Sequence, residues 1–327
     1  MQSKHYRALH DGTVSMIQPT LKYVPCPGPA AVGSAEEGHR MAYWKWNATG
    51  DAAHPRVVVC AHGLSRQGRD FDTLARAMSL HARVVCPDVV GRGQSDWLAD
   101  PMGYQIPLYA ADMLALLAHL HQQAPMRMLD WVGTSMGGLI GMVLCGQPGL
   151  PMPVPVRRLV LNDVGPTIEW QALERIGQYL GQPAHFETLQ QAADALWAIS
   201  RSFGPHTPQE WLELSRAMVR PGPQGGLALH YDPAIAVPFR TLTEEAARAG
   251  EQQMWQLYEQ ITAQVLLLRG AESDLLSAQT AQHMAQRGPR ARVVEFAGVG
   301  HAPTLVAQGQ VDAVVSFLQG DGVEGAA

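Results

Sequence analysis

Long apolar segments are lacking in this sequence. The longest apolar runs, such as VLLL at 265–268, are far shorter than the roughly 20 residues that a helix needs to cross a bilayer. The first residues, MQSKHYRALHDG, are polar and lack the apolar stretch of about 7–15 residues that a secretion signal carries. We therefore expect a soluble, cytoplasmic protein with no membrane partner.

Clustered basic charge and paired cysteine motifs are also lacking. The net charge is −5 and no dense basic stripe occurs, which argues against a nucleic-acid partner. The cysteines show no C-x-x-C spacing; they are Cys26, Cys60, Cys86 and Cys145. We therefore expect no zinc or other metal site, and we interpret Cys60 and Cys86 as small buried residues of strands.

What the sequence does contain is an alternation of β-branched runs with amphipathic stretches. Its 327 residues, 46% of them hydrophobic, suffice for a substantial core. Strands are expected at 39–46, 56–61, 83–87, 128–132, 158–161, 264–268 and 292–296. Helices are expected at 71–80, 108–121, 137–145 and 311–318. This alternation predicts an α/β fold with a mostly parallel sheet flanked by helices.

The alternation is interrupted in the middle of the chain. Residues 166–238 carry helix-like pieces, many aromatic residues and no convincing buried strand, so we interpret them as an inserted helical cap. The sheet domain would then comprise 39–165 and 239–320. Residues 1–38, with Pro25, Pro27, Gly28 and Pro29 near their end, are expected to form an irregular N-terminal arm.

The strand expected at 128–132 leads directly into the motif G-x-S-x-G, formed by Gly133, Ser135 and Gly137. A serine hydroxyl is a poor nucleophile unless a sharp turn exposes it and a base activates it. The helix expected after the motif would offer unpaired N–H groups to a developing oxyanion. Ser135 is therefore the candidate nucleophile.

His301 lies in a loop after the last expected strand, between Gly300 and the Ala302-Pro303 pair. Imidazole exchanges protons near neutral pH and is the usual base for a serine nucleophile. The loop position and the chain order, serine before histidine, favour His301 as the base.

A carboxylate should orient this imidazole, and three candidates remain open. Asp274 follows the strand expected at 264–268 and is favoured by the order serine, aspartate, histidine. Asp163, at the end of the preceding strand, is the first alternative, and Glu272 is the second. The carboxylate that is not used would serve as a hinge of the cap or as a helix cap.

Two backbone N–H groups are expected to form an oxyanion hole. One belongs to Met136, which follows the nucleophile, and the other to Leu64, in the His62-Gly63-Leu64-Ser65 loop after an early strand. His62 would brace this loop rather than react.

Together these motifs resemble the α/β-hydrolase superfamily, in particular its capped bacterial members such as carboxylesterases, enol-lactonases and meta-cleavage C–C hydrolases. The residues that carry the resemblance are His62-Gly63, Asp88, Gly91 to Ser95, Gly133 to Gly138, Asp163, Asp274 and Gly300-His301. The resemblance spans positions from about 57 to 318. It implies the α/β-hydrolase fold, no cofactor, and a structural role for Asp88 and the turn at 91–95. A serine at position 135 argues against the relatives that use an aspartate nucleophile, the haloalkane dehalogenases and epoxide hydrolases.

Arg66, and after it Arg69, is placed to reach the mouth of this site. Its guanidinium could bind a substrate carboxylate bidentately, or could instead form a salt bridge with Asp70, Asp72 or Asp96.

The expected reaction is hydrolysis of carboxylic esters of small to medium size through an acyl-enzyme, with a small acyl compound as the partner. Three alternatives remain open: a C–C bond hydrolase of the meta-cleavage type, an acyltransferase, and a ligand-binding protein without catalysis.

Overall fold

The computed structural model describes residues 17–320. Residues 1–16, the first part of the expected arm, and residues 321–327 lie outside the described residues. Among the described residues, none of the helices is both long and apolar enough to cross a bilayer.

One eight-stranded sheet organises the chain, in the order β1-β2-β4-β3-β5-β6-β9-β10. Its strands are β1 (Thr20–Cys26), β2 (His39–Trp46), β3 (Arg56–Ala61), β4 (Arg83–Pro87), β5 (Met128–Thr134), β6 (Val156–Asn162), β9 (Gln264–Gly270) and β10 (Arg292–Phe296). Parallel pairing joins β4, β3, β5, β6, β9 and β10, whereas β1 pairs antiparallel with β2 and β2 pairs antiparallel with β4. The predicted mostly parallel sheet is therefore confirmed.

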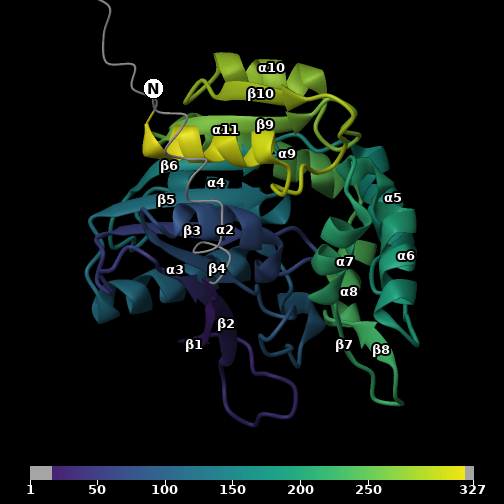
Figure 1. Ribbon diagram of the computed structural model, residues 1–327. Coiled ribbons are helices and arrows are strands. Elements are labelled where there is room, and N and C mark those ends of the chain that lie inside the picture. Colours follow the sequence, from purple (N-terminus) through teal and green to yellow (C-terminus); the bar gives the residue numbers. More distant parts are fainter. Residues whose placement is uncertain (1–16, 321–327) are drawn as a thin grey trace, which may run out of the picture.

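Helices cover both faces of this sheet (Figure 1). They are α2 (Asp72–Met78), α3 (Ile106–Gln123), α4 (Met136–Gly146), α9 (Glu244–Gln260), α10 (Ala278–Gln286) and α11 (Gln308–Gln319). Helices α2 and α11 contact each other on one face, and α4 packs against α3 and α9 on the other. The strands alternate between the two cores: Val57 and Val59 join the core beside α3 and α4, whereas Val58 and Cys60 join the core beside α2 and α11. This two-sided burial explains the continuous apolar runs of the central strands.

The expectation of a wholly irregular arm is wrong for residues 20–26. They form β1, which pairs with β2 along its whole length at the edge of the sheet. An edge strand tolerates Pro25 because it needs partners on one side only. The strand was hard to recognise because most of its side chains are at least partly exposed and it carries no apolar run.

A separate group of elements lies between β6 and β9, and Figure 1 shows it beside the sheet. It comprises α5 (Trp170–Tyr179), α6 (Leu189–Ser200), α7 (Pro208–Arg216), the antiparallel pair β7 (Val219–Pro221) and β8 (Leu227–Leu229), and α8 (Ala236–Arg240). Short 3-10 turns occur at Gly68–Phe71, Pro101–Gly103, Arg201–Phe203 and Pro233–Ile235. We call residues 166–238 the inserted segment; these limits stay a prediction, and the small β7–β8 pair was not anticipated.

The inserted segment has its own small core. Trp211 and Leu214 of α7 pack with Ala193 and Leu196 of α6 and with Met218. Trp197 and Phe203 also contribute to this packing, and the rings of both lie edge-on to that of Trp211. This core holds α6 and α7 as a unit above the carboxyl ends of the strands.

Candidate active site

Ser135 occupies a strained turn between β5 and α4. Its backbone angles are φ 51° and ψ −116°, and a positive φ is rare for a residue with a side chain. The turn is tight: a Cβ on Gly137 would lie 2.0 Å from the Ala61 carbonyl oxygen, and one on Gly133 would lie 2.3 Å from the Gly137 oxygen. Glycine is therefore required on both sides of the serine, as the G-x-S-x-G pattern predicted.

The structure brings Ser135 and His301 together as predicted. Nε2 of His301 lies 3.0 Å from Oγ of Ser135, and Nδ1 lies 2.8 Å from Oδ2 of Asp163. The serine comes from the end of β5, the aspartate from the end of β6, and the histidine from the loop after β10. This is the geometry in which imidazole removes a proton from a hydroxyl while a carboxylate fixes its tautomer.

The Asp163 carboxylate is buried and held by several donors. Its Oδ1 accepts the Gly270 N–H at 2.8 Å, and its Oδ2 accepts the Ser273 hydroxyl at 2.6 Å as well as the His301 ring. The residue has a φ of 55°, so its backbone is strained like that of Ser135. These contacts leave the carboxylate one orientation, toward His301.

The placement of Asp274 corrects our first choice of carboxylate. Asp274 forms a bidentate ion pair with Arg175, at 2.7 and 3.0 Å, and its side chain is 47% exposed. Asp163, our first alternative, is the carboxylate that meets His301, and Glu272 is exposed. The physical reason is that β6 lies next to β5 in the sheet, so its end brings Asp163 near Ser135, whereas Asp274 lies four residues beyond β9 on the surface.

The expected oxyanion hole at Leu64 and Met136 stays a prediction, and the structure shows the surroundings of both residues. Met136 begins α4, so its N–H is among those that have no acceptor within the helix. Leu64 lines the cavity that Ser135 and His301 also line. Its carbonyl oxygen accepts a hydrogen bond from Nε of Arg92 at 2.8 Å. Nη2 of Arg92 also lies 3.8 Å from the sulfur of Met136. The buried Arg92, expected to be structural, thus contacts both residues of the expected hole.

His62 braces the same loop, as expected. The ring is fully buried, Nε2 accepts the Val89 N–H at 2.9 Å, and Nδ1 faces the Gly63 carbonyl oxygen at 2.7 Å. An N–H on one side and a carbonyl on the other require the neutral ring with its proton on Nδ1. Burial accordingly lowers the pKa of His62 to about 3.

Both arginines after this loop form the salt bridges that we gave as the alternative. Arg66 donates to both Asp70 oxygens at 2.6 and 2.7 Å, and Arg69 is paired with Asp72. Arg66 still lines the cavity beside Ser135, beneath the ring of Phe203.

The cavity at Ser135 is bounded by the sheet domain on one side and the inserted segment on the other. The inserted segment contributes mainly apolar side chains; they are Ile176, Leu196, Ile199, Phe203, Met218 and Leu229. It also contributes Arg175, Tyr179 and Tyr231, which sequence reasoning missed. Arg175 and Tyr179 are four residues apart on α5, which places them on the same face of the helix. This spacing is the only feature of the sequence that could have indicated them.

The inserted segment also contacts the loop that carries His301. The Ser202 hydroxyl donates to the His301 carbonyl oxygen at 3.2 Å, and the Gly300 N–H donates to the Ser202 carbonyl oxygen. In addition, Nε2 of His206 lies 2.7 Å from the hydroxyl oxygen of Thr304. The position of His301 therefore depends on the inserted segment as well as on the sheet domain.

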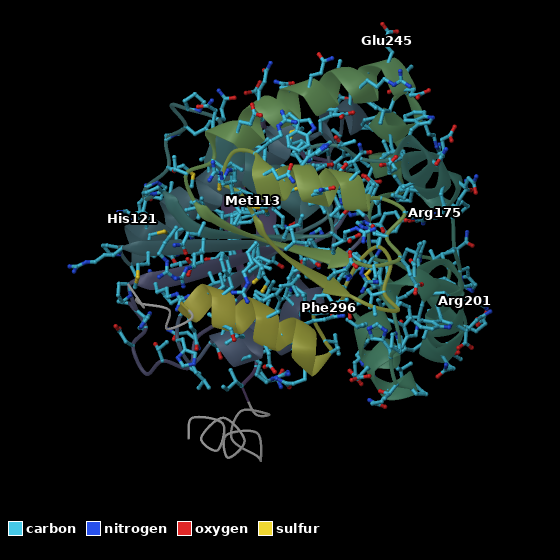
Figure 2. All side chains as sticks on the ribbon, turned by 90° about the horizontal axis from the view of Figure 1, so that it is seen from above. Met113, His121, Arg175, Arg201, Glu245 and Phe296 are labelled. Carbon is cyan, nitrogen blue, oxygen red and sulfur yellow. The ribbon has the colours of Figure 1, made fainter. Side chains whose placement is uncertain are left out.

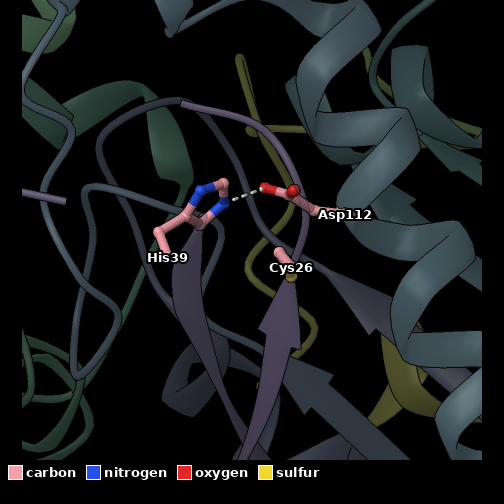
Figure 3. Close-up of side chains that lie close together, drawn as sticks. All are labelled: Cys26, His39 and Asp112. Carbon is pink, nitrogen blue, oxygen red and sulfur yellow. Dashed lines mark hydrogen bonds and ion pairs between the residues drawn. The ribbon is translucent and has the colours of Figure 1, made fainter. Parts of the chain in front are cut away.

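A second polar cluster lies away from this cavity, where β1, β2 and α3 meet (Figure 3). Cys26, His39 and Asp112 are buried, and they offer one sulfur, one nitrogen and one oxygen within 4.8 Å of one another. Such donors suit a transition metal, but Nε2 of His39 already contacts Asp112 at 3.0 Å and Nδ1 contacts the Pro29 carbonyl oxygen at 3.1 Å. These contacts are those of a hydrogen-bonded network that attaches β1 and β2 to α3.

Comparison with known proteins adds a close relative. The chain is 50% identical over 305 residues to the 3-hydroxybutyrate-oligomer hydrolase of Cupriavidus necator, covering 92% of this chain and 98% of the relative. It is 32% identical over 116 residues to the putative carbamate hydrolase RutD of Yersinia enterocolitica, which is 36% of this chain and 38% of that one.

Solved structures share the whole architecture. An α/β hydrolase from Novosphingobium aromaticivorans superposes with a TM-score of 0.76 and 35% identity, over 93% of this chain and 99% of that one. A putative hydrolase from Rickettsia typhi gives a TM-score of 0.77 and 26% identity, over 92% and 99%. The model of the alpha/beta hydrolase family matches residues 58–314. The expected fold is thereby confirmed, and the chain is an enzyme, a hydrolase that belongs to the α/β-hydrolase family.

Proposed function

We propose that this protein is a serine esterase that hydrolyses short oligomers of 3-hydroxybutyrate. The observation that carries the proposal is the connected series Ser135, His301 and Asp163, with contacts of 3.0 and 2.8 Å, of which Ser135 and His301 line a cavity. The substrate class rests on the 50% identity with the hydrolase of Cupriavidus necator over nearly the whole length of both chains.

In the proposed mechanism, His301 Nε2 takes the Ser135 proton while the hydroxyl oxygen attacks the ester carbonyl. The tetrahedral oxyanion accepts hydrogen bonds from the N–H groups of Leu64 and Met136. His301 then protonates the departing hydroxyl oxygen of the next 3-hydroxybutyrate unit, and the acyl group remains on the serine. Asp163 stabilises the imidazolium that forms in each proton transfer.

Water completes the cycle. His301 removes a proton from a water molecule that attacks the acyl-enzyme, and the serine oxygen leaves and recovers its proton. The apolar side chains of the inserted segment suit the methyl and methylene groups of the substrate, and they exclude bulk water from the reacting ester.

The test is release of 3-hydroxybutyrate from the dimer and the trimer by the wild type and by Ser135→Ala. We expect the variant to lose activity by at least about 10³-fold. Hydrolysis of p-nitrophenyl butyrate by the same preparations separates the two parts of the proposal. A wild type that cleaves this ester but neither oligomer is a serine esterase of another substrate, and one that cleaves none of them contradicts the esterase assignment.

A further inference from the structure

The cavity at Ser135 has an unusual charge distribution. Two arginines, Arg66 and Arg175, line it together with His301, and none of the described residues that line it is acidic. The remaining lining is apolar apart from the hydroxyl groups of serine, threonine and tyrosine. Positive charge in a mostly apolar cavity favours an anionic ligand.

The two arginines differ in how firmly they are held. Arg66 is 12% exposed, and its partner Asp70 is 18% exposed. Arg175 is 36% exposed, and its partner Asp274 is 47% exposed. Because Asp274 is readily solvated once released, separating the Arg175 pair costs far less than separating the Arg66 pair.

Arg175 also occupies a boundary between two parts of the molecule. It projects from α5 of the inserted segment, while Asp274 belongs to the loop after β9. Figure 2 shows Arg175 on the side of the molecule that carries Arg201 of the inserted segment, opposite His121. Its ion pair with Asp274 therefore joins the inserted segment to the loop after β9, beside the cavity that Arg175 lines.

We propose that Arg175 binds a free carboxylate of the substrate and that Asp274 occupies this arginine when no substrate is bound. This inference rests on the proposed function, since every linear 3-hydroxybutyrate oligomer ends in one free carboxylate. A carboxylate of the substrate offers two oxygens to the guanidinium, as the carboxylate of Asp274 does, so one bidentate pair can replace the other. Asp274, which we first considered as a catalytic group, thereby acts as an internal competitor.

The experiment measures binding separately from oligomer hydrolysis. The 3-hydroxybutyrate dimer and its methyl ester are used as competitors of p-nitrophenyl butyrate hydrolysis, and their inhibition constants are compared. For the wild type we expect the free acid to bind about 10-fold more tightly than the methyl ester, as a charge-assisted bidentate pair implies. Arg175→Gln should abolish this preference and leave the constant of the methyl ester within about 2-fold.

Two further variants make the test specific. Asp274→Asn frees Arg175, so it should tighten binding of the acid about 2- to 5-fold without affecting the methyl ester. Arg201→Gln removes an arginine of the same segment that does not line the cavity, and it should change neither constant. Equal weakening of acid and ester by Arg175→Gln, or weaker binding of the acid by Asp274→Asn, would overturn the proposal. Release of 3-hydroxybutyrate from the dimer is followed separately, so a failure of the proposed function is visible without obscuring the binding result.

Discussion

Asp163 and His301, 138 positions apart in the chain, meet in a hydrogen bond of 2.8 Å between a carboxylate oxygen and Nδ1. No local pattern links them; the sheet places the end of β6 between the loop that carries the histidine and the end of β5. This contact makes the role of Asp163 testable against that of Asp274.

We predict that Asp163→Asn lowers kcat by about 10⁴-fold, because an amide favours the wrong tautomer of the imidazole and does not stabilise its charge. Asp274→Asn is the matched control, since the same change falls on the carboxylate that pairs with Arg175. It should leave kcat on p-nitrophenyl butyrate within about 3-fold. Inactivity of the Asp274 variant together with an active Asp163 variant would reverse our assignment.

The second prediction concerns Arg92 as a positioning residue. Its guanidinium holds the Leu64 carbonyl at 2.8 Å and the Val90 carbonyl at 2.7 Å, so it fixes the loop whose N–H is expected to face the oxyanion. Arg92→Met should lower kcat about 10- to 100-fold with little change in KM, because the hole acts mainly on the transition state. Arg92→Lys, which retains a donor, should recover part of the loss.

Arg83 provides the control for Arg92. It is also buried and donates to two backbone carbonyls, those of His54 and Ala124, but neither of them belongs to the loop of Leu64. Arg83→Met should lower the thermal midpoint and leave kcat of the folded protein unchanged. Similar losses of kcat in both arginine variants would mean that Arg92 acts only through stability.

The sequence predicted the elements that carry strong local signals. The strands around Val57 to Val59 are continuous apolar runs because both faces of the sheet are covered. The turn at Ser135 was evident because only glycine fits beside it. Both features are determined within a few residues, so the sequence alone is sufficient to identify them.

The features of the site that could not be predicted from the sequence depend on the order of the strands and on the course of the inserted segment. The choice between Asp163 and Asp274 follows from which strand lies beside β5, and both residues follow a strand of similar composition. Arg175 reaches the cavity only because α5 folds back over the sheet, and no motif marks it. Edge strand β1 was missed because its alternating, mostly exposed residues resemble those of a loop.

The third prediction is a pH dependence of stability that arises at His62. The folded-state pKa is lowered to about 3 from an ordinary value of 6.5, so the unfolded chain binds a proton that the folded protein does not bind. The contribution of this ring to stability is therefore complete above pH 6.5 and is lost as the pH falls from 6.5 toward 3. Between pH 7.5 and 5 we expect His62 to reduce the free energy of unfolding by about 2 kcal/mol.

His62→Gln tests this expectation, because glutamine keeps one acceptor and one donor but does not titrate. Urea unfolding at pH 7.5 and at pH 5 gives the change for each protein. The wild type should lose about 2 kcal/mol more than the variant over this interval. Parallel losses in the two proteins would place the acid sensitivity elsewhere in the chain.

The last prediction compares the loss of His39 with the loss of Asp112, which form an ion pair in the buried cluster at β1, β2 and α3. Burial alone would lower the pKa of His39, but the hydrogen bond and charge of Asp112 outweigh it and raise the pKa above 6.5. His39→Phe should destabilise the protein by about 3–5 kcal/mol, because it leaves the Asp112 carboxylate buried without its partner. Asp112→Asn should cost only about 1 kcal/mol, since a neutral His39 can donate from Nδ1 to the Pro29 carbonyl and accept from the new amide at Nε2.

The pH dependence distinguishes the same two variants. A raised folded-state pKa means that the stabilisation from protonated His39 is fully present below pH 6.5 and is lost as the pH rises through the higher, folded-state value. Asp112→Asn removes the negative charge that raises this pKa, so its free energy of unfolding should fall less than that of the wild type between pH 6 and pH 9. Urea unfolding across this range is the measurement, and an equal or steeper fall in the variant would show that Asp112 does not raise the pKa of His39.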